Sequence, residues 1–211
     1  MQHTYFFDDH IDRMMSDSKN EVVLIGSIDQ GTQSSRFIVY DPRDLSVAKA
    51  HHATPLRQSY PRPGWVEQDP EEIWSSVVSS VEGGMHSLRS PEGPTDAYSV
   101  EDPPRMVIGI ANQRETTILW DKETGKPLHN AIVWNDDRTA ELCARLAEEL
   151  GGVDVFRRTT GLPISTYFSA YKIRWMIENV PAVAEAVASK RCMFGTVDCW
   201  LVCVLGKSRA Y

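Results

Sequence analysis

The pattern of residues 21–54 constrains the fold of this 211-residue chain more than any other feature. Two runs rich in β-branched and aromatic side chains, residues 21–28 and 36–40, flank a short polar tract around Gly31. This pattern predicts a strand, a tight turn and a second strand that pairs with the first. Because residues 46–54 could add a third strand, we expect the chain to open with an antiparallel meander.

Helix signals follow the proline-rich and glycine-rich stretch 55–64. Asp69 has the position of an N-cap and Pro70 that of the first helical residue, and an apolar face continues to Val81. Farther along, glycine, proline and apolar periodicity delimit the remaining elements. We expect strands at 106–111, 117–120 and 192–196, helices at 136–150, 169–179 and 181–190, and a short helix from Asp198.

Two segments are expected to lie outside the packed elements. Residues 83–105 are rich in glycine and proline with scattered acidic residues, which is typical of a surface loop, and we interpret them as an insertion without chemistry. Residues 1–20 contain no continuous apolar stretch of the kind that a signal peptide needs. The prediction for them is a flexible leader.

Composition argues against several classes of protein. The chain has 22 lysines and arginines against 29 aspartates and glutamates, so its net charge of −7 argues against nucleic-acid binding through bulk charge. No apolar run approaches the roughly 20 residues of a membrane-spanning helix. The four cysteines lack the spacing of a zinc site or of a secreted disulfide framework. We therefore expect free thiols and an intracellular, cytoplasmic protein, although the sequence does not separate the cytosol from an organelle.

The predicted turn at residues 29–36 is the first candidate site, because it gathers small hydroxyls, amides, one carboxylate and one guanidinium. Gly31 permits close approach of the backbone to a phosphate, and Thr32 and Ser34 can donate hydrogen bonds to it. Asp29 can hold Mg²⁺ through water. An ordinary polar hairpin turn would have the same spacing, so the pattern alone leaves both interpretations open.

Arg114 and Glu115 are the second candidate, because they directly follow a predicted buried strand. A carboxylate accepts hydrogen bonds from neighbouring hydroxyls and a guanidinium donates to oxygen, so the pair suits a polyol. A surface ion pair of little energetic weight is the alternative. Trp134 and Tyr167 carry less signal, and on spacing alone they are interpreted as packed core residues.

Several ordered segments together resemble a known family. They are residues 29–36, 63–70, 112–117, 121–128, 131–134, 160–163, 167–170, 172–175 and 194–198. In this order they are similar to the glycerol kinases of the FGGY carbohydrate kinases, over residues 22 to about 205. The Arg114-Glu115 pair within its Gln-Arg-Glu-Thr-Thr block resembles the kinases for glycerol rather than those for larger sugars.

The resemblance implies an α/β domain of the ribonuclease-H-like, actin-like ATPase class, with a mixed sheet and flanking helices. Residues 21–206 would form most of the family's N-terminal domain, with the insertion at 83–105, and residues 207–211 would be a divergent tail. The family's second domain is expected to be absent, and with it the aspartate that acts as general base and the adenine pocket. Family members are often dimers or tetramers, so a homo-oligomer is compatible with a full-length member.

The resemblance also implies the reaction, in which ATP, with Mg²⁺, phosphorylates a terminal hydroxyl of glycerol to give glycerol 3-phosphate. The residues expected at the ATP phosphates are Thr32, Gln33, Ser34 and Arg36. The residues expected at glycerol are Arg114, Glu115, Trp134 and Tyr167. Arg114 and Asp29 are the expected catalytic residues, because they hold the reactants, and Asp29 does so by positioning Mg²⁺ through water.

Two features depart from the family pattern. Gln33 stands where the family usually has a second threonine, and its longer amide is expected to reach a phosphate instead. The chain is also expected to be inactive, or nearly so, without the general base. Two alternatives to an active glycerol kinase therefore stay open, a non-catalytic glycerol-binding or regulatory fragment and a kinase for another polyol.

Overall fold

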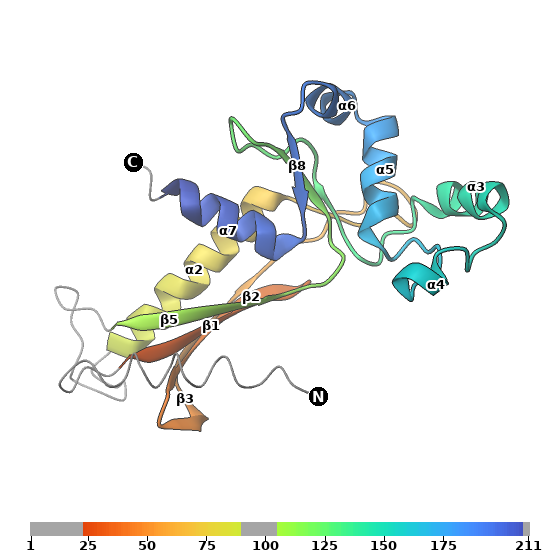
Figure 1. The fold of residues 1–211 in the computed structure, drawn as a ribbon. Coiled ribbons are helices and arrows are strands. Elements are labelled where there is room, and N and C mark those ends of the chain that lie inside the picture. The colour runs from red at the N-terminus through yellow and green to blue at the C-terminus, as the bar shows by residue number, and fades with distance from the viewer. Residues whose placement is uncertain (1–22, 90–104, 209–211) are drawn as a thin grey trace.

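A mixed sheet of four strands forms one half of the computed structural model, which describes residues 23–89 and 105–208 (Figure 1). In spatial order the strands are β3 (Asp44–Pro55), β2 (Ser34–Asp41), β1 (Leu24–Gln30) and β5 (Met106–Asn112). The first three strands pair antiparallel, as the sequence predicts, and β5 pairs parallel to β1. β1 and β5 therefore end side by side, at Gln30 and Asn112.

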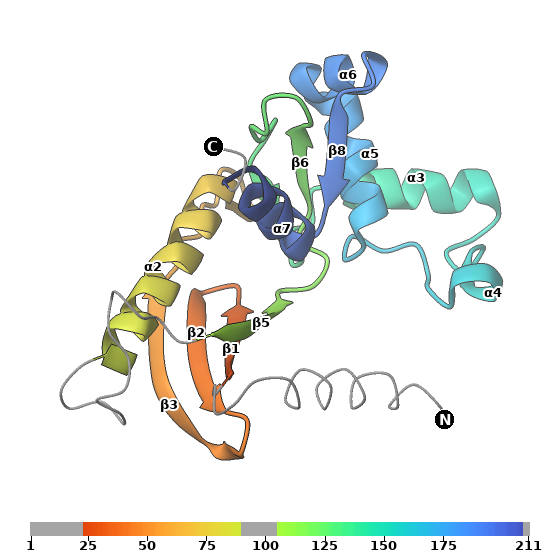
Figure 2. The same ribbon diagram turned by 60° about the vertical axis from the view of Figure 1, so that its left-hand side comes forward.

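One face of this sheet carries the core. Side chains alternate across a strand, so Ile28 of β1 and its partner Phe37 of β2 share a face, and both are buried. Helix α2 (Pro70–Arg89) packs on this face (Figure 2). Helix α7 (Val197–Ser208) contributes Trp200 to the same apolar cluster. The sheet thus has two helices on the side of its buried face.

Helix α2 is longer than the sequence indicates. We expected a loop to begin at Gly83, but α2 continues through this residue and Gly84, so this part of the prediction is wrong. A β-carbon on Gly84 would lie 2.7 Å from the ring of Phe37, and one on Gly83 would lie 2.4 Å from the ring of His52. The two glycines therefore let the helix approach the sheet closely. The remainder of the predicted insertion, residues 90–104, lies outside the described residues.

The other half of the structure contains short strand pairs and further helices. Their bounds are β4 (Glu67–Gln68), β6 (Ile118–Asp121), β7 (Ala131–Ile132), β8 (Cys192–Gly195), α3 (Ala140–Leu150), α4 (Arg157–Thr160), α5 (Ser169–Asn179) and α6 (Pro181–Ala188). β6 pairs antiparallel with β8, and β4 pairs with β7. Both views place α3 and α4 on the far side of β8 from α2 (Figures 1 and 2). A second, smaller apolar cluster joins these strands and helices through Leu119, Ile132, Met176 and Val183.

Several predicted boundaries agree closely with the structure, and α3 shows a clear difference. α5 has the predicted bounds, whereas α3 begins at Ala140 and not at Asp136. The carboxylate of Asp136 accepts hydrogen bonds from the backbone N–H groups of Val66 and Arg138. These bonds hold the segment in a turn ahead of the helix. At its other end α3 stops at Gly151, which has a φ of 93°, as the glycine signal predicts.

Two predicted segments lie wholly or partly outside the described residues. The expected leader, residues 1–20, is one of them. Of the expected tail, residues 207–211, the first two belong to α7 and the last three are not described. Across the described ranges, no helix is long and apolar enough to cross a bilayer.

Candidate functional site

A pocket of about 460 Å³ opens at the carboxyl ends of β1 and β5. Open α/β sheets bind ligands at this edge, because the loops that follow the strands supply polar groups there. The sequence-predicted site residues that line the pocket are Asp29, Thr32, Arg114, Trp134 and Tyr167. The other lining residues are Gln30, Gly31, Asn112 and Gln113. Five of the predicted site residues therefore line the pocket, together with four that were not predicted as site residues.

The turn between β1 and β2 forms one wall of the pocket. The N–H of Gly31 donates to the carbonyl of Ser34 at 2.9 Å, which closes the turn around Thr32. Asp29 and Arg36 are paired across the two strands, and their side chains form an ion pair at 2.9 Å. Three residues predicted to face the phosphates are outside the pocket lining, namely Gln33, Ser34 and Arg36.

Trp134 lies between this turn and the helical half of the structure. Its indole Nε1 donates a hydrogen bond to the hydroxyl of Thr32 at 3.0 Å. Its ring meets that of Tyr167 edge-on, with 6.2 Å between the ring centres. Trp134 remains 39% exposed, so the alternative that it is a core residue is wrong. Tyr167 is partly buried and packs against the rings of Trp134 and Phe168. The two rings form an aromatic wall of the pocket.

A buried network of glutamine side chains backs the turn. Gln113 Nε2 donates to Oε1 of Gln30 at 3.1 Å and to Oε1 of Gln68 at 2.8 Å. Gln113 Oε1 accepts from the hydroxyl of Thr116 at 2.8 Å, and Gln68 Nε2 donates to the carbonyl of Thr32 at 2.7 Å. Because all three amides are buried and bonded, they form a polar frame that fixes the turn against β4.

Glu115 does not line the pocket, and its carboxylate has another partner. Glu115 Oε2 accepts hydrogen bonds from the backbone N–H and the hydroxyl of Ser169, each at 2.8 Å. Ser169 is the first residue of α5, so the carboxylate lies at the positive end of that helix. Glu115 also has a φ of 59°, which residues other than glycine rarely adopt. It holds α5 against the segment that presents the exposed Arg114 to the pocket.

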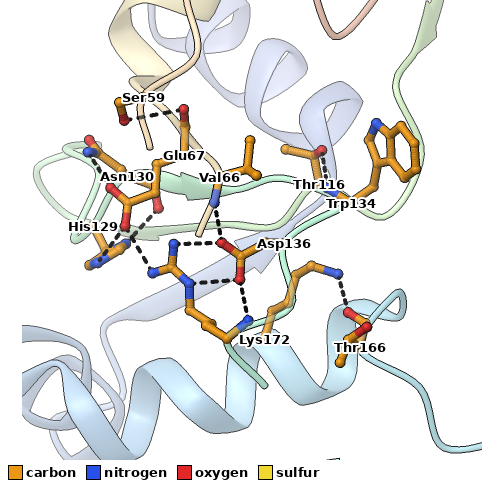
Figure 3. Close-up of polar contacts among 11 residues, drawn as sticks. Ser59, Val66, Glu67, Thr116, His129, Asn130, Trp134, Asp136, Thr166 and Lys172 are labelled. Carbon is orange, nitrogen blue, oxygen red and sulfur yellow. Dashed lines mark hydrogen bonds and ion pairs between the residues drawn. The ribbon is translucent and has the colours of Figure 1, made fainter. Parts of the chain in front are cut away.

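A buried ion cluster anchors the segment that follows Trp134 (Figure 3). Arg138 donates to the two carboxylate oxygens of Asp136 at 2.9 and 2.8 Å, and it pairs with Glu67 at 2.9 Å. The guanidinium of Arg138 also lies 3.9 Å from the centre of the Trp65 ring. Because these charges are buried together, losing one would leave its partners uncompensated. The cluster therefore ties β4 firmly to the turn behind Trp134.

Comparison with known proteins assigns this geometry to a family. Residues 24–209 match the model of the FGGY family of carbohydrate kinases, N-terminal domain. The chain belongs to the FGGY family of carbohydrate kinases. Its mixed sheet with flanking helices is the actin-like ATPase fold of that N-terminal domain, as the sequence predicts.

Individual relatives extend this assignment of the FGGY domain. This chain is 45% identical over 183 residues to a probable glycerol kinase of Caenorhabditis elegans, and the match covers 86% of this chain and 35% of that protein. It is 48% identical over 180 residues to a glycerol kinase of Arabidopsis thaliana, with coverages of 85% and 33%. The crystal structure of Plasmodium falciparum glycerol kinase with ADP matches with a TM-score of 0.74 and 33% identity, over 88% of this chain and 35% of that chain. The FGGY domain described here spans about one third of the length of these relatives.

The pocket of the FGGY domain offers little for a metal ion on its own. Within residues 23–89 and 105–208, no three His, Cys, Asp or Glu side chains gather closely enough to hold a metal. Asp29 supplies one carboxylate, beside Arg36. Mg²⁺ is commonly bound through one or two carboxylates, several waters and the phosphates of the substrate. Asp29 therefore fits a Mg²⁺ that arrives with a nucleotide, held through water.

Sequence reasoning missed the glutamines that support the FGGY pocket. Gln68 and Gln113 lie inside segments 63–70 and 112–117, which carry the family resemblance. Their position in these segments was the one sequence signal that could have pointed to a role at the site. Glutamine is mostly exposed in proteins, so its burial here depends on partners that are distant in sequence. Their role became visible from the hydrogen bonds of the folded chain.

Proposed function

We propose that this FGGY domain supplies the polyol-binding and phosphate-binding half of an ATP-dependent glycerol kinase, which forms glycerol 3-phosphate. One observation carries the proposal. The pocket joins an exposed guanidinium, two aromatic rings and a hydroxyl-bearing turn within about 460 Å³. A small polyol requires hydrogen-bond donors for its oxygens and an apolar surface for its carbons, and this pocket offers both.

The polyol would lie against the side of the pocket that Arg114, Trp134 and Tyr167 form. Arg114 donates from a planar, rigid guanidinium, so it can hold a hydroxyl oxygen in a fixed direction. The rings of Trp134 and Tyr167 cover the C–H groups and restrict the site to a narrow chain. Glu115 supports this arrangement from behind, through its bonds to the first residue of α5.

The phosphates of ATP would lie against the turn between β1 and β2. Thr32 and the backbone N–H groups of the turn donate to phosphate oxygens, and Gln33 and Ser34 lie close enough in sequence to join them. Mg²⁺, when bound, neutralises the charge that develops on the transferring phosphoryl group. Asp29 would orient the water shell of that ion, while Arg36 holds the Asp29 carboxylate in place.

The reacting hydroxyl must also lose its proton. Among the residues that line the described pocket, Asp29 is the one carboxylate, and it is already paired with Arg36. We therefore assign Asp29 to positioning of the reactants and not to accepting this proton. For this chain we propose glycerol binding, with turnover dependent on a proton acceptor outside the pocket lining.

Calorimetric titration of glycerol into the purified chain, in a glycerol-free buffer, tests the proposal. We expect saturable binding that weakens at least roughly tenfold in Arg114→Ala, the effect of losing a charged hydrogen-bond donor. Arg158→Ala, a change at an exposed arginine of α4, is the matched control and is expected to bind like the unchanged chain. The absence of binding by any polyol would overturn the proposal, and tighter binding of a five-carbon polyol would favour another FGGY kinase. An assay for glycerol 3-phosphate with Mg-ATP then measures turnover directly.

A further inference from the structure

Lys172 is a fully buried lysine on α5, with 0% of its surface exposed. Its ammonium group donates to the backbone carbonyl of Thr166 at 2.9 Å (Figure 3). It also donates to the backbone carbonyl of Tyr167 at 2.5 Å. None of the ion pairs found among the described residues includes Lys172. A buried ammonium group is costly unless its donors are satisfied, so these two carbonyls are its decisive partners.

The two carbonyls belong to the loop that leads into α5. The backbone N–H groups next to these carbonyls make longer contacts: the N–H of Tyr167 lies 3.3 Å from the hydroxyl of Ser165, and the N–H of Phe168 lies 3.3 Å from the Ser165 carbonyl. The bonds from Lys172 are shorter and come from a charged donor, which makes them the stronger ones. Lys172 therefore clamps the loop back onto the first turn of its own helix.

The clamped residue contributes to the pocket. Tyr167 lines it, and the Tyr167 ring packs edge-on against the rings of Trp134 and Phe168. A ring on a loop is held less precisely than one on a helix or strand, unless other bonds fix its backbone. The two carbonyl bonds fix the backbone at Tyr167 itself and at the residue before it.

We propose that Lys172 is a positioning residue for the polyol side of the pocket, which sets the Tyr167 ring by clamping the carbonyls of residues 166 and 167. This inference rests on the proposed function, because it assigns Tyr167 to the polyol. Lys172 itself lies outside the pocket lining and acts through Tyr167. Its effect on ligand affinity should therefore vanish when the Tyr167 ring is absent.

The test uses Lys172→Met in the 211-residue chain, because methionine has a similar length and removes the N–H donors. Incorporated 3-fluorotyrosine reports the ring environment by ¹⁹F NMR, with the Tyr167 signal assigned by its loss in Tyr167→Phe. We expect this signal to shift or broaden in Lys172→Met and glycerol to bind roughly tenfold more weakly. In a Tyr167→Ala background, Lys172→Met should cause no further loss of affinity.

A matched control separates positioning from general destabilisation. Val183→Ala opens a cavity in the buried cluster that joins α6 to α5 through Met176, and it removes no bond to the loop, so it should leave the Tyr167 signal unchanged. A folded Lys172→Met chain with an unchanged Tyr167 signal and unchanged glycerol affinity would overturn the inference. If Lys172→Met does not fold, Lys172→Gln takes its place, because its shorter side chain keeps only an uncharged N–H₂ donor, and the same two changes are expected in weaker form. If the unchanged chain binds no glycerol, the proposed function fails, and the ¹⁹F signal still decides whether the clamp exists.

Discussion

The indole Nε1 of Trp134 donates a hydrogen bond to Oγ1 of Thr32 at 3.0 Å, between residues 102 positions apart in sequence. A hydroxyl that accepts one hydrogen bond retains its own proton for donation elsewhere. Trp134 therefore orients the Thr32 hydroxyl as a donor toward whatever occupies the turn. The bond joins the side of the pocket assigned to phosphate with the side assigned to the polyol.

This bond predicts a coupling between Trp134 and Thr32 in glycerol binding. Trp134→Phe keeps an aromatic ring but loses the N–H, and Thr32→Val keeps the shape but loses the acceptor. Each change should weaken glycerol binding about fivefold, equivalent to about 1 kcal/mol for one hydrogen bond. The double variant should bind about as well as either single one, because the same bond is lost. Calorimetric titration of all four chains checks this prediction. If the fold-losses of glycerol affinity in the two single variants multiply in the double variant, the hydrogen bond does not hold the Trp134 ring.

The buried amide network predicts a large difference between two glutamines. Gln113→Ala removes the partner of Gln30, Gln68 and Thr116 at once, and each would be left buried without that bond. We expect a loss of about 2–4 kcal/mol in the free energy of unfolding. Gln33→Ala is the matched control, because Gln33 is exposed on the neighbouring turn, and it should change stability by less than about 0.5 kcal/mol. Urea denaturation measures both, and equal small effects would mean that the network contributes little.

Two helical glycines are predicted to respond to alanine with opposite signs. Gly84 packs against Phe37, and an added β-carbon would lie 2.7 Å from that fully buried ring. Gly84→Ala should therefore lower the free energy of unfolding by about 1–3 kcal/mol despite the better helix propensity of alanine. An added β-carbon on Gly206 of α7 would meet no atom within 4 Å, so Gly206→Ala should raise stability by up to about 1 kcal/mol. Thermal or urea unfolding gives both signs, and a stabilising Gly84→Ala would show that α2 has room to move away from the sheet.

Local signals predicted the parts of the fold that depend on neighbouring residues. The hairpin around Gly31 and the bounds of α5 follow from periodicity and turn chemistry within a few positions, and the structure agrees. Gly83 and Gly84 were misinterpreted, because a glycine required by packing against a sheet looks the same in sequence as one required by a turn. That distinction depends on Phe37 for Gly84 and on His52 for Gly83, and both residues lie far earlier in the sequence.

In the candidate site, too, features set by neighbouring residues were predicted, and features set by residues distant in sequence were not. The polar residues that follow β1 and the Arg114-Glu115 pair that follows β5 were singled out as two separate candidates, because each set is contiguous in sequence, and residues of both line the pocket. The exposure of Trp134 was not predicted from spacing, since an isolated tryptophan after an apolar run is usually packed. Nor could spacing show that the carboxylate of Glu115 bonds to Ser169, because that contact spans 54 positions and depends on how α5 docks.

Burial of Lys172 predicts a specific dependence of stability on pH. Burial lowers the pKa of this lysine from its usual 10.5 to about 8, although the carboxylates of Glu115 and Asp136 and the thiol of Cys143 act in the opposite direction. Between these two values the unfolded chain binds more protons at this position than the folded chain does. The contribution of Lys172 to the free energy of unfolding should therefore rise with pH across this range.

The measurement is the difference in unfolding free energy between the unchanged chain and Lys172→Met, taken by urea denaturation at several pH values. Taking the difference removes titrations that both chains share, such as that of Tyr171, whose pKa burial also raises. Relative to Lys172→Met, the unchanged chain should gain stability from about pH 8 to about pH 10.5, by about 3 kcal/mol at most for a shift of this size. A difference that stays flat over this interval would mean that Lys172 keeps an ordinary pKa and that water reaches its ammonium group. A difference that falls with pH would mean that the neighbouring carboxylates outweigh burial and hold the lysine in its charged form.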